Sequence, residues 1–165
     1  SFSAPLTDVF SYYGEVTVGK EASNITVQLT RAVAKIQLNI TDDIPEGVSF
    51  FNYIYKGASV SFDPATQIGV VSSTRRNVEI EKAEGVKTFE LYTFVSSDNQ
   101  TVDWDFAGYS ESNEVIGSKK FSDIPVSLRK VTKIDSPVFD GVIEGPTDIT
   151  FTFDDTWDGV VDYTF

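Results

Sequence analysis

The stretch from Asn24 to Thr41, NITVQLTRAVAKIQLNIT, decides the fold. Residues 25–29 alternate between apolar and polar types, as expected of a strand with one buried face. After Arg31 the apolar residues move to the even positions and stay there until residue 40. Successive side chains of a strand point to opposite faces, so this reversal requires an extra residue, a bulge or a bend at residues 30–32.

A long strand that changes its buried face carries the chain from one sheet to another. A helix over residues 32–38 is the competing interpretation, and the β-branched residues with the flanking alternation disfavour it. About ten short alternating segments follow, separated by turn signals. The pattern predicts an all-β fold, a Greek-key β-sandwich of transthyretin-like or immunoglobulin-like type.

We expect one domain over residues 1–165, with residues 1–13 as an extended lead-in, and this domain is compatible with a larger two-domain precursor. Clear strands are expected at 48–55, 87–95, 101–106, 149–153 and 161–165, a short strand at 15–18 and a weaker one at 138–143. Residues 107–120 are rich in Gly, Ser, Glu and Asn, which predicts a mobile hairpin or loop around Val115 and Ile116. Pro125 restricts its strand to a sheet edge, a strand end or a bulge.

The amino-acid composition excludes several classes of function. The chain has 165 residues, enough to bury about 70% of its unfolded surface, and it contains thirteen Phe and seven Tyr. With no Cys and no His, disulfides, thiolate nucleophiles, imidazole zinc ligands and histidine triads are excluded. The net charge of −12 argues against nucleic-acid binding. No apolar run approaches the ~20 residues of a membrane-spanning helix.

No residue pattern indicates catalysis, so we expect no enzyme, no cofactor and no metal. The acidic turn at Asp154, Asp155 and Asp158 could offer calcium ligands, but it lacks the spacing of the calcium-binding loop, and a solvated hairpin turn is the simpler interpretation. A surface made by Trp104 and Tyr109 is the candidate ligand surface, by stacking on a sugar. The alternative is that Trp104 covers one end of the core.

Four segments together resemble the fimbrillin-like family of Bacteroides-type gut and oral anaerobes. These are DVFSYYGEVTV near the start, VQLTRAVAKIQLNI at 27–40, KTFELYTF at 87–94, and KKFSDIPVSLRKVTKIDSPVFDG at 119–141. The resemblance covers roughly residues 8–165, and its motifs are strands rather than catalytic signatures.

The resemblance implies a structural or adhesive lipoprotein of the bacterial cell surface, outer membrane or fimbrium, lipid-anchored before processing. Its partners would be other fimbrial subunits, joined by strand exchange, with a host or glycan ligand as a further partner; a role in stalk, anchor or tip stays open. Physically, a neighbour's strand can complete an open sheet edge. The candidate donor or edge strands carry Ile149, Phe151, Phe153, Val161, Tyr163 and Phe165. Closure of this domain's own core by the same strands is the alternative, and a carbohydrate-binding β-sandwich is the alternative function.

Overall fold

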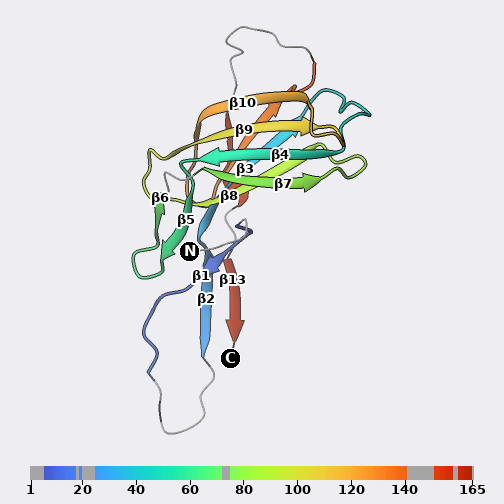
Figure 1. The fold of residues 1–165 in the computed structure, drawn as a ribbon. Coiled ribbons are helices and arrows are strands. Elements are labelled where there is room, and N and C mark those ends of the chain that lie inside the picture. Colours follow the sequence, from blue (N-terminus) through green and yellow to red (C-terminus); the bar gives the residue numbers. More distant parts are fainter. Residues whose placement is uncertain are drawn as a thin grey trace.

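The computed structural model describes residues 6–17, 19, 25–71, 75–140, 151–157 and 160–164. This part of the chain consists almost entirely of strands (Figure 1). In chain order the elements are β1 (Phe10–Ser11), β2 (Thr26–Arg31), β3 (Val33–Ile40), β4 (Phe50–Lys56), β5 (Ser59–Asp63), β6 (Ile68–Val71), β7 (Arg76–Glu81), β8 (Thr88–Phe94), β9 (Thr101–Tyr109), β10 (Val115–Pro125), β11 (Val131–Ser136), β12 (Thr152–Asp154), the 3-10 helix η1 (Asp155–Trp157) and β13 (Val160–Thr164).

Two sheets form the body of the molecule. A four-stranded sheet has the order β10-β9-β4-β7, and a six-stranded sheet has the order β12-β11-β3-β8-β5-β6. Both contribute side chains to one buried cluster. The predicted all-β sandwich is therefore confirmed. The strand pairs of the described residues are antiparallel except for β3 and β11, which run parallel. The sequence pattern did not predict this exception.

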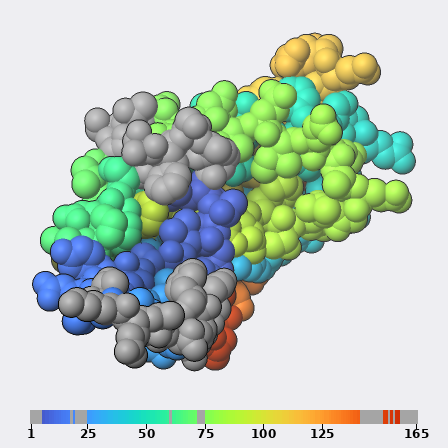
Figure 2. All heavy atoms as spheres, turned by 90° about the horizontal axis from the view of Figure 1, so that it is seen from below, coloured from blue at the N-terminus to red at the C-terminus, as the bar shows by residue number. Residues whose placement is uncertain are grey.

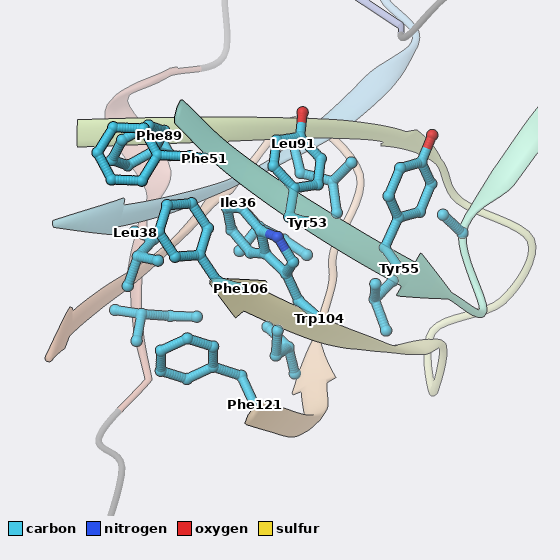
Figure 3. Close-up of a cluster of buried hydrophobic side chains, with 14 of the residues drawn as sticks. Ile36, Leu38, Phe51, Tyr53, Tyr55, Phe89, Leu91, Trp104, Phe106 and Phe121 are labelled. Atoms are coloured by element: carbon cyan, nitrogen blue, oxygen red, sulfur yellow. The ribbon is translucent and has the colours of Figure 1, made fainter. Parts of the chain in front are cut away.

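The core follows from strict alternation in the central strands. In β4 and β9 every second side chain is buried, and these include Phe51, Tyr53, Trp104 and Phe106. Figure 3 shows these rings packed together with Phe89 of the opposite sheet. The ring centroids of Phe51 and Phe106 lie 4.8 and 4.7 Å from that of Phe89, in edge-on and tilted arrangements. Aromatic pairs favour such geometries, which lets large rings fill the space between the sheets.

The change of face at residues 30–32 is confirmed. β2 ends at Arg31 and β3 begins at Val33, so Ala32 alone separates them. The backbone N–H of Ala32 donates to the carbonyl of Val9 (2.8 Å). β3 belongs to the sandwich, but β2 belongs to a third sheet of order β1-β2-β13, which extends away from the body in Figure 1. The chain thus passes from the sandwich into a projecting ribbon.

The hairpin predicted at 107–120 is confirmed, but it consists of two long paired strands rather than a loop. β9 continues to Tyr109, a tight turn follows, and β10 returns along it from Val115. The glycines serve close packing rather than flexibility, because a Cβ on Gly108 or Gly117 would come within 2.7 or 2.5 Å of the Phe139 ring. Composition suggested a loop because glycine is unfavourable in strands unless something approaches closely.

Two weaker strand predictions are also wrong within the described residues. Residues 15–17 form no strand, and residues 138–140 form a bend that is held by side-chain contacts described below. The prediction for Pro125 is confirmed, since it ends β10 at the edge of the four-stranded sheet. Residues 33–38 belong to the strand β3 rather than to a helix.

Candidate functional site

β12 carries the first of the two predicted terminal segments. It is the edge strand of the six-stranded sheet, where it pairs with β11 through Thr132↔Phe153 and its neighbours. Phe151, just before it, is partly buried and packs against the core of the sandwich. Ile149 lies outside the described residues. This segment therefore contacts the core of its own domain.

β13 carries the second segment, and its position is different. It pairs with β2 at five positions, among them Val161↔Leu29 and Tyr163↔Val27. Among the described residues it is the last strand of its sheet, and β1 pairs with β2 only at Arg31 and Thr30. Phe165 lies outside the described residues. β2 and β13 form what we call the ribbon, which stands clear of the two packed sheets (Figure 1).

Arg31 holds the base of the ribbon. Its guanidinium makes two parallel hydrogen bonds to the carboxylate of Asp8, at 2.8 and 2.9 Å, and donates to the carbonyl of Trp157. It also lies over the rings of Trp157 (4.0 Å) and Phe10 (4.8 Å). Because a guanidinium is planar, it can bond both oxygens of a carboxylate and also stack flat on an aromatic ring, which an ammonium group cannot. One side chain thus joins the N-terminal segment, the face switch and η1.

Lys35 of the six-stranded sheet is a second cation that lies near Trp157. Lys35 forms an ion pair with Glu90 (2.9 Å), and its Nζ lies 5.1 Å from the centre of the Trp157 ring. Tyr92 donates its hydroxyl hydrogen bond to Glu90 (2.8 Å). Burial, followed by this bond to a carboxylate, raises the pKa of Tyr92 well above its ordinary value. We call Asp8, Phe10, Arg31, Lys35, Glu90, Tyr92 and Trp157 the basal clasp.

The N-terminal segment covers the side of this region. Leu6 and Val9 pack against a small buried group made by Ala32, Val33 and Phe94, together with Phe62 of β5. In Figure 2, seen from below, the dark-blue N-terminal segment lies against the green atoms of the β5–β6 hairpin. Sequence reasoning missed both the clasp and this cover, because their members come from segments that lie far apart in the chain.

The far edge of the six-stranded sheet is apolar and exposed. β6 ends the sheet, and its Ile68, Val70 and Val71 are 49%, 59% and 46% exposed. β6 contains no charged residue. Natural sheets usually protect an edge with lysine, proline or a bulge, so an uncharged apolar edge marks a surface suited to pairing.

Asp42 fixes the bend at 138–140, in the segment for which the sequence had suggested a strand. Its carboxylate is nearly buried and accepts hydrogen bonds from the backbone N–H groups of Val138, Phe139 and Asp140. Burial by itself would raise the pKa of Asp42, but the three amides outweigh it and lower the pKa below the usual value. The Asp-rich loop at 42–43 hinted at a turn but not at this anchor.

The acidic turn after β12 is held by local contacts. The carboxylate of Asp154 accepts hydrogen bonds from the backbone and side chain of Thr156, and it pairs with Lys133 at 2.9 Å. These hydrogen bonds hold the pKa of Asp154 far below its ordinary value. Among the described residues no group of three or more acidic side chains is placed to hold a metal ion, and Asp158 lies outside them.

Of the two interpretations of Trp104, the ligand surface is wrong and a position in the core is confirmed. Its side chain is fully buried, with the indole inside the core between Tyr53 and Phe106 (Figure 3). The alternation in β9 was interpreted correctly, but the apolar face that includes Trp104 points toward the opposite sheet. Tyr109 lies on the other face, partly exposed and stacked on Phe50 with centroids 5.2 Å apart.

A hollow of about 310 Å³ adjoins Tyr109 on the outer face of the four-stranded sheet. We call it the outer hollow. A second hollow of about 170 Å³, the cationic hollow, continues it, since Ile54, Asp105 and Lys120 line both. The alternation of β4 and β9 places these residues opposite the core, which sequence reasoning could have shown once Trp104 was assigned inward.

Comparison with known proteins assigns the chain to no family. No family model, no curated protein and no solved structure matches this chain. Within the described residues, no helix has the length and apolar character needed to cross a membrane.

Proposed function

We propose that this chain is a non-enzymatic structural or adhesive subunit of a bacterial surface fibre, and that copies assemble by exchanging β13. The observation that carries the proposal is the ribbon: β13 pairs with β2 outside the packed sheets and ends its own sheet. The sequence segments that resemble fimbrillin-like proteins support the proposed location, a fimbrium or outer membrane, where the subunit would be lipid-anchored before processing. Other subunits are the proposed partners.

The physical argument concerns stability. A two-stranded ribbon in water is marginal without a third strand or a packed face. No side chain of β2 is fully buried, whereas five apolar side chains of β3 are at most 4% exposed. Replacing the chain's own β13 by that of a neighbour keeps every backbone hydrogen bond and adds contacts between copies. Exchange therefore costs little and gains an interface.

β13 is a better donor than β12. β12 pairs with β11 beside β3, and Phe151 packs on the core, so its removal would expose the sandwich. β13 lies beyond η1 and pairs with β2 alone in its sheet. The apolar edge at β6 offers a second surface along which assembled copies can meet.

The absence of cysteine permits a direct test. Gln28 and Asp162 are register partners in β2 and β13, and partners in an antiparallel pair lie within the reach of a disulfide. We expect the double variant Gln28→Cys/Asp162→Cys to form a disulfide within one chain at low protein concentration. After concentration and assembly, oxidation should instead give covalent dimers and higher ladders on a non-reducing gel.

The matched control is Asn39→Cys/Thr88→Cys, which joins partners of β3 and β8 inside the sandwich. This pair should remain within one chain under all conditions. The proposal is contradicted if the β2–β13 pair also stays within one chain after concentration. A deletion of residues 160–165 should leave a folded monomer that no longer assembles; loss of the folded state would show that β13 belongs to the core.

A further inference from the structure

The outer face of the four-stranded sheet has the layout of a ligand site. Asn52 and Ile54 of β4 and Asp105 of β9 alternate with the buried residues and so face away from the core. Ala107 pairs with Asn52 across the strands, and its small side chain leaves space between larger neighbours. The resulting outer hollow, at about 310 Å³, lies at the lower end of the range typical of small-molecule sites.

One end of this face is polar and bordered by an aromatic ring, and Lys119 also lines the outer hollow. Asn52, Ser118 and Tyr109 line it, and Phe50 supports the Tyr109 ring by parallel stacking. Amide and hydroxyl groups beside an aromatic ring suit a ligand with an apolar ring face and several hydroxyls.

Asp105 provides an unsatisfied acceptor between the two hollows. Its Oδ1 is buried but accepts no hydrogen bond, and the Nζ of Lys120 lies 4.0 Å from it. The Asp105 side chain as a whole is 37% exposed, so its carboxylate is open to a ligand in the hollow. A ligand hydroxyl placed in the hollow would satisfy it.

The other end is cationic. Lys56, Arg75 and Lys120 line the cationic hollow against two carboxylates, those of Asp103 and Asp105. This excess of cations stands out in a chain with twenty-five acidic and thirteen basic residues. Glu79 on the adjacent β7 is exposed opposite Asn52 and lines neither hollow. The local field at this end therefore favours an anionic group.

From these observations we propose that the face binds an acidic saccharide, with a sugar ring beside Tyr109 and its carboxylate near Lys56, Arg75 and Lys120. The Asp105 oxygen accepts a sugar hydroxyl. The site is independent of β13 and of assembly, because it is built wholly from β4, β9, β10 and the residue before β7.

The test is calorimetric titration of the intact chain with short oligomers of galacturonate, glucuronate and mannuronate and with sialyllactose. Each acidic ligand is paired with its neutral counterpart, the methyl ester or the unsialylated sugar. We expect at least one acidic ligand to bind and its neutral partner to bind roughly tenfold more weakly, the effect of losing one charged hydrogen bond. Failure of every acidic ligand, or equal binding of the neutral partners, overturns the proposal.

Two variants locate the site. Lys120→Gln should weaken acidic-ligand binding roughly tenfold, and its exposed side chain makes misfolding no concern. Lys133→Gln removes the same charge from the opposite sheet and should leave binding unchanged. Equal losses in both variants would show that net charge rather than this face governs binding, and would contradict the proposal.

Discussion

β2 and β3 are two halves of one sequence stretch with the same alternation but different surroundings. In β3 the apolar side chains of Ile36 and Leu38 are fully buried between two sheets. In β2 the corresponding residues, Val27 and Leu29, are only partly buried, and their strand belongs to a separate three-stranded sheet. Alternation therefore specifies that a segment is a strand and which side is apolar, but not whether another sheet covers that side.

This difference divides the molecule into a self-sufficient sandwich and a dependent ribbon. The sandwich buries large rings from both sheets, and burial of apolar area is the dominant stabilising term in folding. The basal clasp at the foot of the ribbon is polar and aromatic. The two regions should accordingly respond differently to truncation of the same residue type.

The largest effect is expected from truncating leucine in each half. Leu38→Ala should lower the free energy of unfolding by about 2–5 kcal/mol, because it removes fully buried atoms and leaves a cavity. Leu29→Ala, at the same kind of strand position, should cost about 1 kcal/mol or less. Urea denaturation measures both. Equal losses would show that the ribbon is as well packed as the sandwich.

Much of the sandwich could be predicted from the sequence because its strands are half-buried and alternate clearly. Phe89, Leu91 and Thr93 face inward in β8 as the pattern of 87–95 indicated. The parallel pairing of β3 with β11 could not be predicted, since it joins segments almost a hundred residues apart and local pattern carries no register.

The candidate sites were harder to predict than the fold. Trp104 was placed correctly in a strand, but its face depended on which side the other sheet covers. Gly108 and Gly117 suggested a loop because their function is to admit the ring of Phe139, which lies outside the hairpin in sequence. The contact between Arg31 and Trp157 joins residues 126 apart, and neither has a local signal for it.

The next prediction concerns Arg31 in the basal clasp. Arg31→Ala should release the ribbon without unfolding the sandwich, because it removes the bidentate bond to Asp8 and the contact with Trp157. Hydrogen exchange of the β2 amides should accelerate at least about tenfold, equivalent to the loss of one charged hydrogen bond, while β3 amides keep their protection.

Arg31→Lys is the matched control for this prediction. It retains the charge but loses the planar pair of donors, so β2 should exchange at an intermediate rate. If Arg31→Ala instead accelerates exchange equally in β2 and β3, the two strands open as one unit. The division between sandwich and ribbon would then be wrong.

The last prediction compares the clasp of the ribbon with the anchor of the body. Asp42→Asn should lower the free energy of unfolding by about 1–3 kcal/mol at neutral pH, because a carboxylate that accepts three backbone amides is replaced by a neutral amide. The folded pKa of Asp42 is depressed, so the stability that it contributes is present above the unfolded value of about 3.9. That contribution is lost as the pH falls through the folded pKa.

The difference between the native chain and Asp42→Asn should accordingly be constant from neutral pH down to about 4 and shrink below it. Urea denaturation at a series of pH values measures the difference. Asp43→Asn is the control, since that neighbouring carboxylate is fully exposed and its pair with Lys87 contributes little. A difference that persists unchanged in acid would mean that the hydrogen bonds at Asp42 depend on shape rather than charge. Loss of β2 protection in the same variant would show that the body anchor and the ribbon are coupled.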